Sequence, residues 1–244
     1  MYIHGRNADK LQRVIAEIKE LSTNNNINGF VADFTDLAAV RQMAQQINAE
    51  LPQLDALVNN AGVYNSSISH NKDGYDIRFV VNFFAPYLLT NSLTPLLQKG
   101  NKARIINLSS AAQASVMLNV LTGETKVSAQ DAYAQSKLAL TMWSFYLTNK
   151  LQDTNVIAVN PGSLLNTNMV KEAFGKFWSP AEKGGNIIYD LAVSDEYKNV
   201  TGKYFDNDKG NPIGTFGEAH PDAYDDAKIE RLIKETSVIL EAKQ

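Results

Sequence analysis

The 244-residue sequence contains no cysteine, which excludes disulfide bonds and thiolate metal sites. Its three histidines, His4, His70 and His220, are isolated from one another and do not form a metal-binding cluster in the sequence. No apolar run approaches the ~20 residues that span a bilayer, and the first residues do not resemble a signal peptide. We therefore expect a soluble, cytoplasmic protein with no membrane span.

The chain also lacks a large excess of positive or negative charge. The chain has 23 basic and 26 acidic side chains, a formal net charge of -3, and no basic stripe that would favour nucleic acid or anionic lipid. Its 44% hydrophobic and 20% charged residues are ordinary for a globular protein. Residues 1–244 are thus expected to form one domain that does not bind nucleic acid.

Short apolar segments alternate with amphipathic ones along the chain. A helical region across residues 75–99 is expected to break or bend near Pro86. Ser179-Pro-Ala-Glu182 has the pattern of a helix start with a capping serine, and residues 222–242 form a final amphipathic helix. The alternation predicts an α/β fold with a parallel sheet covered on both faces. Strands are expected at the first residues and at 27–34, 54–58, 103–108, 155–159 and 202–205.

A helix without proline or glycine is predicted around residues 131–147, and it carries Tyr133 and Lys137 four positions apart. That spacing puts both side chains on one helical face. An ammonium ~4 Å from a phenol, at an effective dielectric constant of ~20, contributes up to ~4 kcal/mol. This energy could lower the phenol's pKa by as much as ~3, so Lys137 is expected to bring Tyr133 near neutrality.

Several polar or glycine-containing motifs follow predicted strands. In open parallel sheets, ligands bind beyond the carboxyl ends of the strands. Each motif alone has a plain alternative, because Asn-Asn-Ala-Gly and Pro-Gly are turn sequences and Ser-Ser can cap a helix. Their shared position at strand ends favours a functional site instead. The candidates are Arg6, Asp33, Asn60-Ala61-Gly62, Ser110 and Pro161-Gly162.

Together these motifs resemble the short-chain dehydrogenase/reductase family, over Met1 to about Phe205. His4-Gly-Arg-Asn7 and Gln135-Ser-Lys-Leu138 are most similar to its retinol-dehydrogenase and carbonyl-reductase-like members. The resemblance implies a Rossmann-like, doubly wound, three-layer α/β/α domain. The motifs are Asn59-Asn-Ala-Gly62, Val81-Asn82, Ile105-Ile-Asn-Leu-Ser-Ser110, Tyr133-Ala-Gln-Ser-Lys137 and Asn160-Pro-Gly162.

The resemblance implies an oxidoreductase that interconverts a carbonyl compound and an alcohol by hydride transfer. Tyr133 would be the general acid and base, and Lys137 would also bind the cofactor's ribose. Ser110 would hydrogen-bond the substrate oxygen, with Ser109 a structural hydroxyl. Asn82 would hold a water that relays protons from Lys137.

Cofactor contacts follow from the same resemblance. Asp33 would meet the adenine, Asn60, Ala61 and Gly62 would pass close to the adenosine ribose, and Pro161 and Gly162 would pack near the nicotinamide. The threonine that binds the nicotinamide carboxamide would be Thr167, displaced by one position.

Arg6 bears on the choice between NADP and NAD. NAD-preferring members usually have an acid after the second strand, whereas this chain has Arg6 there and no acid until Asp9. A guanidinium suits a 2′-phosphate, so NADP is favoured over NAD. The alternative for Arg6 is a solvated residue at a helix start.

Two further departures concern the pocket and the assembly. Twenty-two residues separate Ser110 from Tyr133, and the extra loop, roughly 114–130, is expected to shape the pocket and to cover a helix face that other members use to dimerise. A homodimer is the assembly that the family suggests. Phe174, Phe177 and Trp178 either close over a bulky apolar substrate or pack in the core.

The family pattern also includes a strand and a T-G-x-x-x-G-x-G turn that would precede Met1. In the strand order 3-2-1-4-5-6 that strand is central, so its loss is expected to expose two strand edges inside the sheet. The favoured explanation is a fragment or an internal start of a longer gene. Completion by another chain or a rearranged segment, and a non-catalytic truncated relative acting as a binding or scaffold protein, are the alternatives.

Overall fold

The computed structural model describes residues 1–210 and 213–241. Every expected strand is present, and one short antiparallel strand, β7, was not predicted. The strands are β1 Tyr2–Gly5, β2 Asn28–Val31, β3 Ala56–Asn59, β4 Arg104–Leu108, β5 Asn155–Asn160, β6 Lys203–Asp206 and β7 Thr215–Gly217.

Helices connect the strands in the order that the hydrophobic periodicity predicts. The α-helices are α1 Ala8–Ser22, α2 Leu37–Glu50, α3 Ile77–Phe79, α4 Ala85–Leu97, α5 Leu118–Leu121, α6 Ala129–Lys150, α7 Asn168–Phe174, α8 Ala181–Val193 and α9 Asp226–Glu241. A π-helical turn, η1 Val80–Phe84, and two 3₁₀ turns, η2 Asp195–Tyr197 and η3 Pro221–Tyr224, complete the described helical elements.

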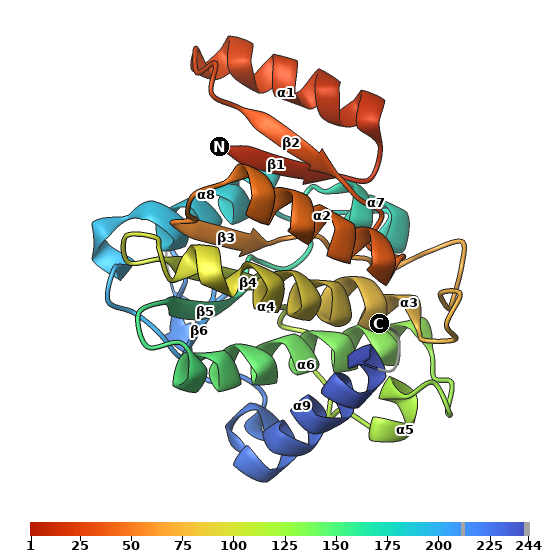
Figure 1. The fold of residues 1–244 in the computed structure, drawn as a ribbon. Helices are drawn as coiled ribbons and strands as arrows, with labels where there is room; N and C mark the ends of the chain where they lie inside the picture. The colour runs from red at the N-terminus through yellow and green to blue at the C-terminus, as the bar shows by residue number, and fades with distance from the viewer. Residues whose placement is uncertain (211–212, 242–244) are drawn as a thin grey trace.

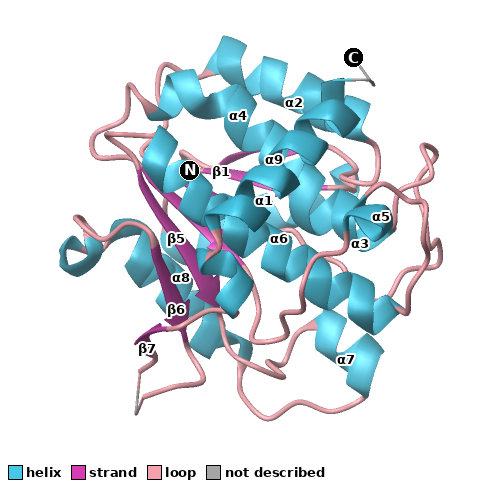
Figure 2. Cartoon of the chain, turned by 90° about the horizontal axis from the view of Figure 1, so that it is seen from below, coloured by secondary structure: helices cyan, strands magenta, loops and turns pink. Residues whose placement is uncertain are grey.

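The strands form two groups rather than one continuous sheet. β1 and β2 pair in parallel, and β3-β4-β5-β6-β7 form a second sheet that is parallel except for the β6–β7 pair. Figure 1 shows β1 and β2 with α1 at one end of the molecule, and Figure 2 shows β5, β6 and β7 side by side. In the described residues no strand joins β1 to β3, and Val58 of β3 is 37% exposed. The interruption expected inside the sheet is therefore present.

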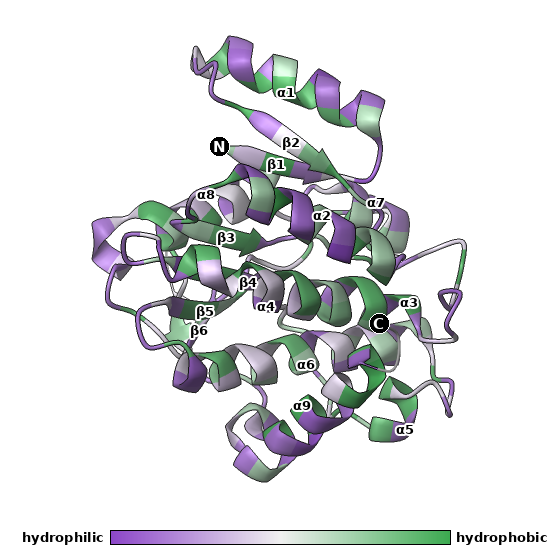
Figure 3. Ribbon diagram, viewed as in Figure 1, coloured by the Kyte–Doolittle hydropathy of each residue, from purple (hydrophilic) through white to green (hydrophobic). Residues whose placement is uncertain are grey.

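Helices cover both faces of the five-stranded sheet, as a doubly wound fold requires. Successive residues of β4 point to opposite sides: Ile105 belongs to the large core with Trp143 of α6, and Ile106 packs with Leu191 of α8. The core helix α4 alternates hydrophobic and paler polar parts, whereas α1 carries hydrophilic stretches over much of its length (Figure 3). The predicted three-layer α/β/α architecture is confirmed.

The helical region near Pro86 is not broken. The backbone stays helical from α3 through the π-helical turn η1 into α4, and Pro86 follows directly after this π-turn. Asn82 lies in this π-turn and is fully buried among apolar residues. Such turns occur frequently at functional sites.

Three details differ from the prediction. The N-cap of α8 is Pro180, with no side-chain cap, and the backbone carbonyl of Ser179 instead accepts a hydrogen bond from the Asn166 N–H at 2.8 Å. The final helical region is divided into η3 and α9, and its predicted end at Ala242 lies outside the described residues. Helix α9 and η3, rather than the loop of residues 114–130 alone, pack against α6.

The helix α9 is tied to the body of the domain by polar contacts as well as by packing. The Tyr87 hydroxyl lies 3.1 Å from the Ser237 hydroxyl, and the Arg41 guanidinium donates to the Leu240 carbonyl at 2.6 Å. Across the described residues, none of the helices has both the length and the apolar character needed to cross a bilayer.

The two tryptophans provide a test of where the core lies. Trp143 is fully buried and Trp178 is 72% exposed. We expect Trp143→Ala to lower the free energy of unfolding by about 3–5 kcal/mol, because it leaves a large cavity. The matched variant Trp178→Ala should change it by less than about 0.5 kcal/mol. Urea denaturation measures both values, and equal losses would contradict the assigned core.

Candidate active site

The candidate residues converge at the carboxyl ends of β3, β4 and β5. Gly62 follows β3, Ser110 follows β4, and Pro161 follows β5. The helix α6 packs against β4 and β5, and brings Tyr133 and Lys137 to this edge one helical turn apart. The parallel sheet therefore gathers residues that are far apart in the sequence.

The Tyr133–Lys137 pair does not have the electrostatics expected from the sequence. The Lys137 ammonium lies 5.6 Å from the centre of the Tyr133 ring and donates to the Leu108 carbonyl at 2.7 Å. Burial lowers the pKa of Lys137 to about 8. Burial also raises the pKa of Tyr133, against a smaller lowering by the Ser110 hydrogen bond. The expectation that Lys137 alone brings Tyr133 near neutrality is wrong, because burial disfavours the charged form of both groups.

The two serines after β4 have different surroundings. The Ser110 side chain hydrogen-bonds Tyr133, and its oxygen also accepts from the Ala112 N–H at 3.1 Å. Ser109 is buried, with its hydroxyl 3.1 Å from the Lys137 carbonyl and 2.6 Å from the Thr141 hydroxyl. Ser110 therefore faces the phenol, while Ser109 fastens β4 to α6.

Asn82 connects the π-turn to the loop after β3. Its amide oxygen accepts from the Val63 N–H at 2.7 Å, and its amide nitrogen donates to the Val63 carbonyl and the Ser136 hydroxyl, both at 3.0 Å. A Cβ on Gly62 would lie 3.4 Å from the Asn82 amide oxygen and 3.6 Å from the Lys137 ammonium. These are ordinary van der Waals distances, so the backbone at Gly62 lies close to both polar groups without requiring glycine there.

An amide network beneath these residues was not recognised in the sequence. The Asn59 amide donates to Asn107 at 2.7 Å and to the Thr90 hydroxyl at 3.0 Å, and Asn107 donates to Ser144 of α6 at 2.8 Å. The signal was available, since Asn107 interrupts the otherwise apolar run Ile105-Ile106-Asn107-Leu108. A buried asparagine requires such partners, so these bonds fix β3, β4 and α6 relative to one another.

Tyr64 is a second residue that the sequence did not single out. Its ring meets the Tyr133 ring edge-on at 4.9 Å and lies 5.4 Å from Phe174 of α7. The Arg78 guanidinium donates to the Tyr64 carbonyl at 2.9 Å and holds this part of the loop. Phe177 and Trp178 are 48% and 72% exposed, which excludes core packing as their explanation.

The residues expected to contact the adenosine part of the cofactor lie on the β1–β2 unit and the loop after β3. Arg6 is exposed and lines a cavity of about 290 Å³ together with Ser66, Ser67 and Glu172. The Asp33 carboxylate accepts from the Thr35 N–H at 2.9 Å at the end of β2. The cation and the two hydroxyl groups suit a phosphorylated ligand, whereas the Glu172 carboxylate in the same cavity opposes an anion.

Helix α7 and its N-cap contribute two further features to the site. Thr167 is the N-cap of α7, with its hydroxyl accepting from the Val170 N–H at 3.4 Å, so its role in the structure is to start a helix. Met169 of α7 covers Gly62, because a Cβ on Gly62 would lie 3.4 Å from its terminal methyl group. The segment α7 therefore lies directly over the candidate site.

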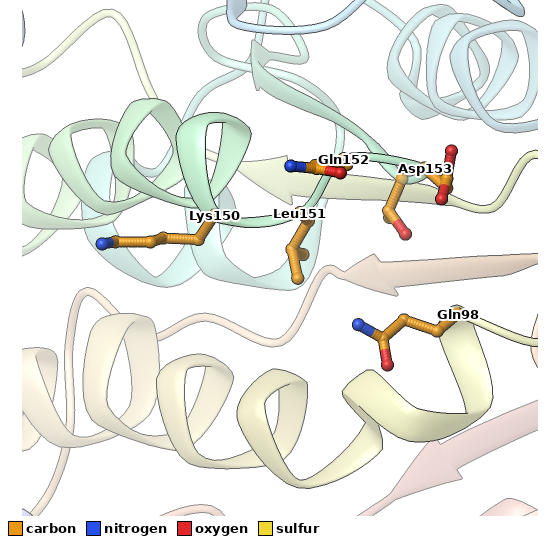
Figure 4. A pocket seen from close by; sticks show the side chains of 6 residues that line it. Gln98, Lys150, Leu151, Gln152 and Asp153 are labelled. Carbon is orange, nitrogen blue, oxygen red and sulfur yellow. The ribbon is translucent and has the colours of Figure 1, made fainter.

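A second cavity, of about 210 Å³, lies at the other end of the sheet (Figure 4). Gln98 reaches it from the end of α4, and Lys150, Gln152 and Asp153 come from the end of α6 and the turn before β5. It faces the amino end of β5 and none of the predicted site residues line it. In the described part of the chain no cluster of metal-ligating side chains accompanies either cavity.

Comparison with known proteins decides the family. The family model described as short chain dehydrogenase matches residues 1–176. The chain belongs to the short-chain dehydrogenase family. Its relatives include the polyprenol dehydrogenase of Homo sapiens, 32% identical, with 85% of this chain and 69% of the relative covered. Retinol dehydrogenase 13 of Homo sapiens is 31% identical, with 95% and 74% covered.

Solved structures with the same fold are consistent with this assignment. A protein of this family from Escherichia coli in complex with NADPH is 26% identical, with a TM-score of 0.67 and 84% of each chain covered. A protein from Mycobacterium paratuberculosis has a TM-score of 0.76 at 20% identity, with 98% and 83% covered, and shows the likeness of fold. The chain is thus an oxidoreductase that acts on alcohol or carbonyl groups with a nicotinamide cofactor.

The buried ammonium of this short-chain dehydrogenase gives a prediction for stability against pH. Between pH 8 and 10.5 the folded state holds a neutral Lys137 while the unfolded chain binds the proton. The free energy of unfolding should therefore rise with pH relative to Lys137→Met, by about 2 kcal/mol between pH 7 and 9.5. Urea denaturation of both proteins at each pH measures the difference, in which all other titrations cancel. A difference that stays constant with pH would contradict the buried ammonium.

Proposed function

We propose that the protein is an NADP-dependent oxidoreductase that interconverts an apolar carbonyl compound and its alcohol, with Tyr133 as the general acid and base. The hydrogen bond between Ser110 and Tyr133, beside Lys137 at the carboxyl ends of the strands, carries this proposal. At this place Tyr133 supplies a proton donor, Ser110 a group that can orient an oxygen, and Lys137 a cation.

The electrostatics suit the reduction direction. The raised pKa of Tyr133 keeps its phenol protonated at neutral pH, so the hydroxyl can donate a proton to a carbonyl oxygen held by Ser110. A nicotinamide cofactor supplies or accepts the hydride. Lys137, whose pKa is about 8, holds a proton close by that can replace the one Tyr133 donates. In this proposal Asn82 holds the connecting water, and Pro161 and Gly162 face the nicotinamide.

Arg6 supports NADP as the cofactor. Arg6 lines one open cavity with Ser66, Ser67 and Glu172. A 2′-phosphate there would find a positive charge and hydrogen-bond donors, with the Glu172 carboxylate as the one opposing charge among the lining residues. Structures of relatives from Escherichia coli and Shigella flexneri are described as complexes with NADPH and NADP. Asp33, Asn60 and Ala61 complete the proposed adenosine contacts.

The aromatic surface over Tyr133 supports an apolar substrate. Tyr64 and Phe174 lie against one another beside Tyr133, and the exposed Phe177 and Trp178 continue from α7. Retinol and polyprenol, which the names of two relatives mention, are apolar alcohols. We therefore expect large apolar alcohols and their carbonyl forms to react better than small polar ones.

Tyr133→Phe tests the proposed proton donor. Because it removes only a hydroxyl, it should lower kcat by about 10²–10⁴-fold and leave the Kd for NADPH within about twofold. Tyr189→Phe, at an exposed position on α8, is the matched control and should keep full turnover. Stopped-flow turnover and fluorescence titration with NADPH measure the two quantities. Undiminished turnover would refute the role of Tyr133, and absence of NADPH binding by the wild-type chain would refute the enzyme function.

Arg6→Ala tests the cofactor preference. Removing the guanidinium should raise KM for NADPH by about tenfold or more, with little effect on KM for NADH, because only NADPH has the 2′-phosphate. Arg13→Ala removes the same charge from an exposed position on α1 and should leave both constants unchanged. A wild-type preference for NADH would contradict the proposal.

A further inference from the structure

The loop after β5, which contains Pro161 and Gly162, is held by a carboxylate from outside the predicted motifs. Asp208 lies two residues after the end of β6. One carboxylate oxygen accepts from the Ser163 N–H at 2.9 Å, and the other accepts from the same N–H at 3.0 Å and from the Ser163 hydroxyl at 2.6 Å. The second oxygen also accepts from the Asn160 amide at 2.8 Å.

Asn160 joins this carboxylate to the rest of the loop. Its amide nitrogen also donates to Asp206 at 2.8 Å, and its amide oxygen accepts from the Gly162 N–H at 3.3 Å. Asn160 and Asp206 are both buried, at the ends of β5 and β6. One Asp206 oxygen accepts from the Asn160 amide and also from the Asp208 N–H, at 3.1 Å. The Asp206 carboxylate at the end of β6 is therefore bonded to the backbone of Asp208, whose own carboxylate holds the loop.

Gly162 makes the loop dependent on these bonds. Its φ of 123° lies in a region that other residues rarely adopt, and glycine is also the most flexible residue. A glycine in the middle of a turn has no side chain with which to fix its own backbone. The bonds to Asn160 and, through Ser163, to Asp208 flank it on both sides and hold that conformation.

Strand β6 also contacts the segment after β4 that contains Ser110. The Tyr204 hydroxyl donates to the Ser110 carbonyl at 2.9 Å. The segment from Tyr204 to Asp208 therefore touches the backbone of the residue that hydrogen-bonds Tyr133 and also the loop that contains Pro161 and Gly162. No other described segment is bonded in this way to both.

We propose that Asp208 is a positioning residue for the dinucleotide, acting through Ser163 and Asn160 to fix the backbone of Pro161 and Gly162. This inference rests on the proposed function, in which that backbone meets the nicotinamide. Hydrogen bonds from Ser163 and Asn160 lower the pKa of Asp208, against partial desolvation that acts in the opposite direction, so the carboxylate is ionised at neutral pH. Charge-assisted bonds of this kind are the stronger ones.

Asp208→Asn is the decisive variant, because it keeps the shape of the side chain. With its amide oxygen facing Asn160 and the Ser163 hydroxyl, asparagine keeps the 3.0 Å contact to the Ser163 N–H. Its NH₂ group replaces the oxygen that accepts from this N–H at 2.9 Å, so that bond and the negative charge are both lost. In the protein without cofactor, the Ser163 amide should exchange its hydrogen about tenfold faster or more. KM and Kd for NADPH should rise by about tenfold, while kcat at saturating NADPH should fall by less than about threefold.

Two further variants complete the experiment. Asp153→Asn removes the same charge in an exposed turn before the other end of β5, and should change neither the exchange rate nor the NADPH constants. Ser163→Ala keeps the backbone bond to Asp208 and loses only the hydroxyl bond, so it should show a smaller effect in the same direction. It provides the measurement if Asp208→Asn does not fold.

The outcomes separate the two proposals. An unchanged Ser163 exchange rate in Asp208→Asn would show that the carboxylate does not hold the loop. Faster exchange with unchanged NADPH constants would overturn the positioning role. Absence of NADPH binding by the wild-type chain would overturn the proposed function, and the cofactor role of Asp208 with it, whatever the exchange rate.

Discussion

The amide network of Asn59, Asn107 and Ser144 is the interaction on which the candidate site depends. These groups are buried under the carboxyl ends of β3 and β4, where an unpaired amide would cost about 1–3 kcal/mol. Apolar packing alone would tolerate sliding of α6 along the sheet. The directional bond from Asn107 to Ser144 opposes such sliding, together with the Ser109 bonds to α6, and these bonds hold Tyr133 and Lys137 at the strand ends.

Burial then determines the chemistry of the pair that this network positions. A phenol and an amine in water would titrate close together, and the cation would favour the phenolate. In the protein interior both groups avoid charge, so the pKa of Tyr133 is raised and that of Lys137 falls to about 8. The result is a protonated donor beside a weakened base. In the proposed function, a cofactor that carries positive charge in one redox state would change this balance.

The sheet is unusual in having its two parts meet without a shared ladder of hydrogen bonds. The part that carries Tyr133, Ser110, Lys137 and Asp208 is internally connected through β3 to β7, and includes the large core around α4 and α6. The part that carries Arg6 and Asp33 is a two-stranded unit with α1 packed on it through a small separate cluster. The residues that we propose for the chemistry and those that we propose for selecting the cofactor thus lie on differently supported parts of the molecule.

The sequence by itself determined the order and type of the elements. Alternation of short apolar runs with helical periodicity is a local property, so the strands and α6 could be predicted, and the short motifs identified the family. Only the tertiary structure decided what depends on distant neighbours. Burial determines the direction in which the Tyr133 pKa shifts. Contacts between distant segments place the Tyr64 ring against Tyr133 and bond Asp208 to a loop 45 residues earlier. The spacing of residues in the sequence carries no information on burial or on contacts between distant segments.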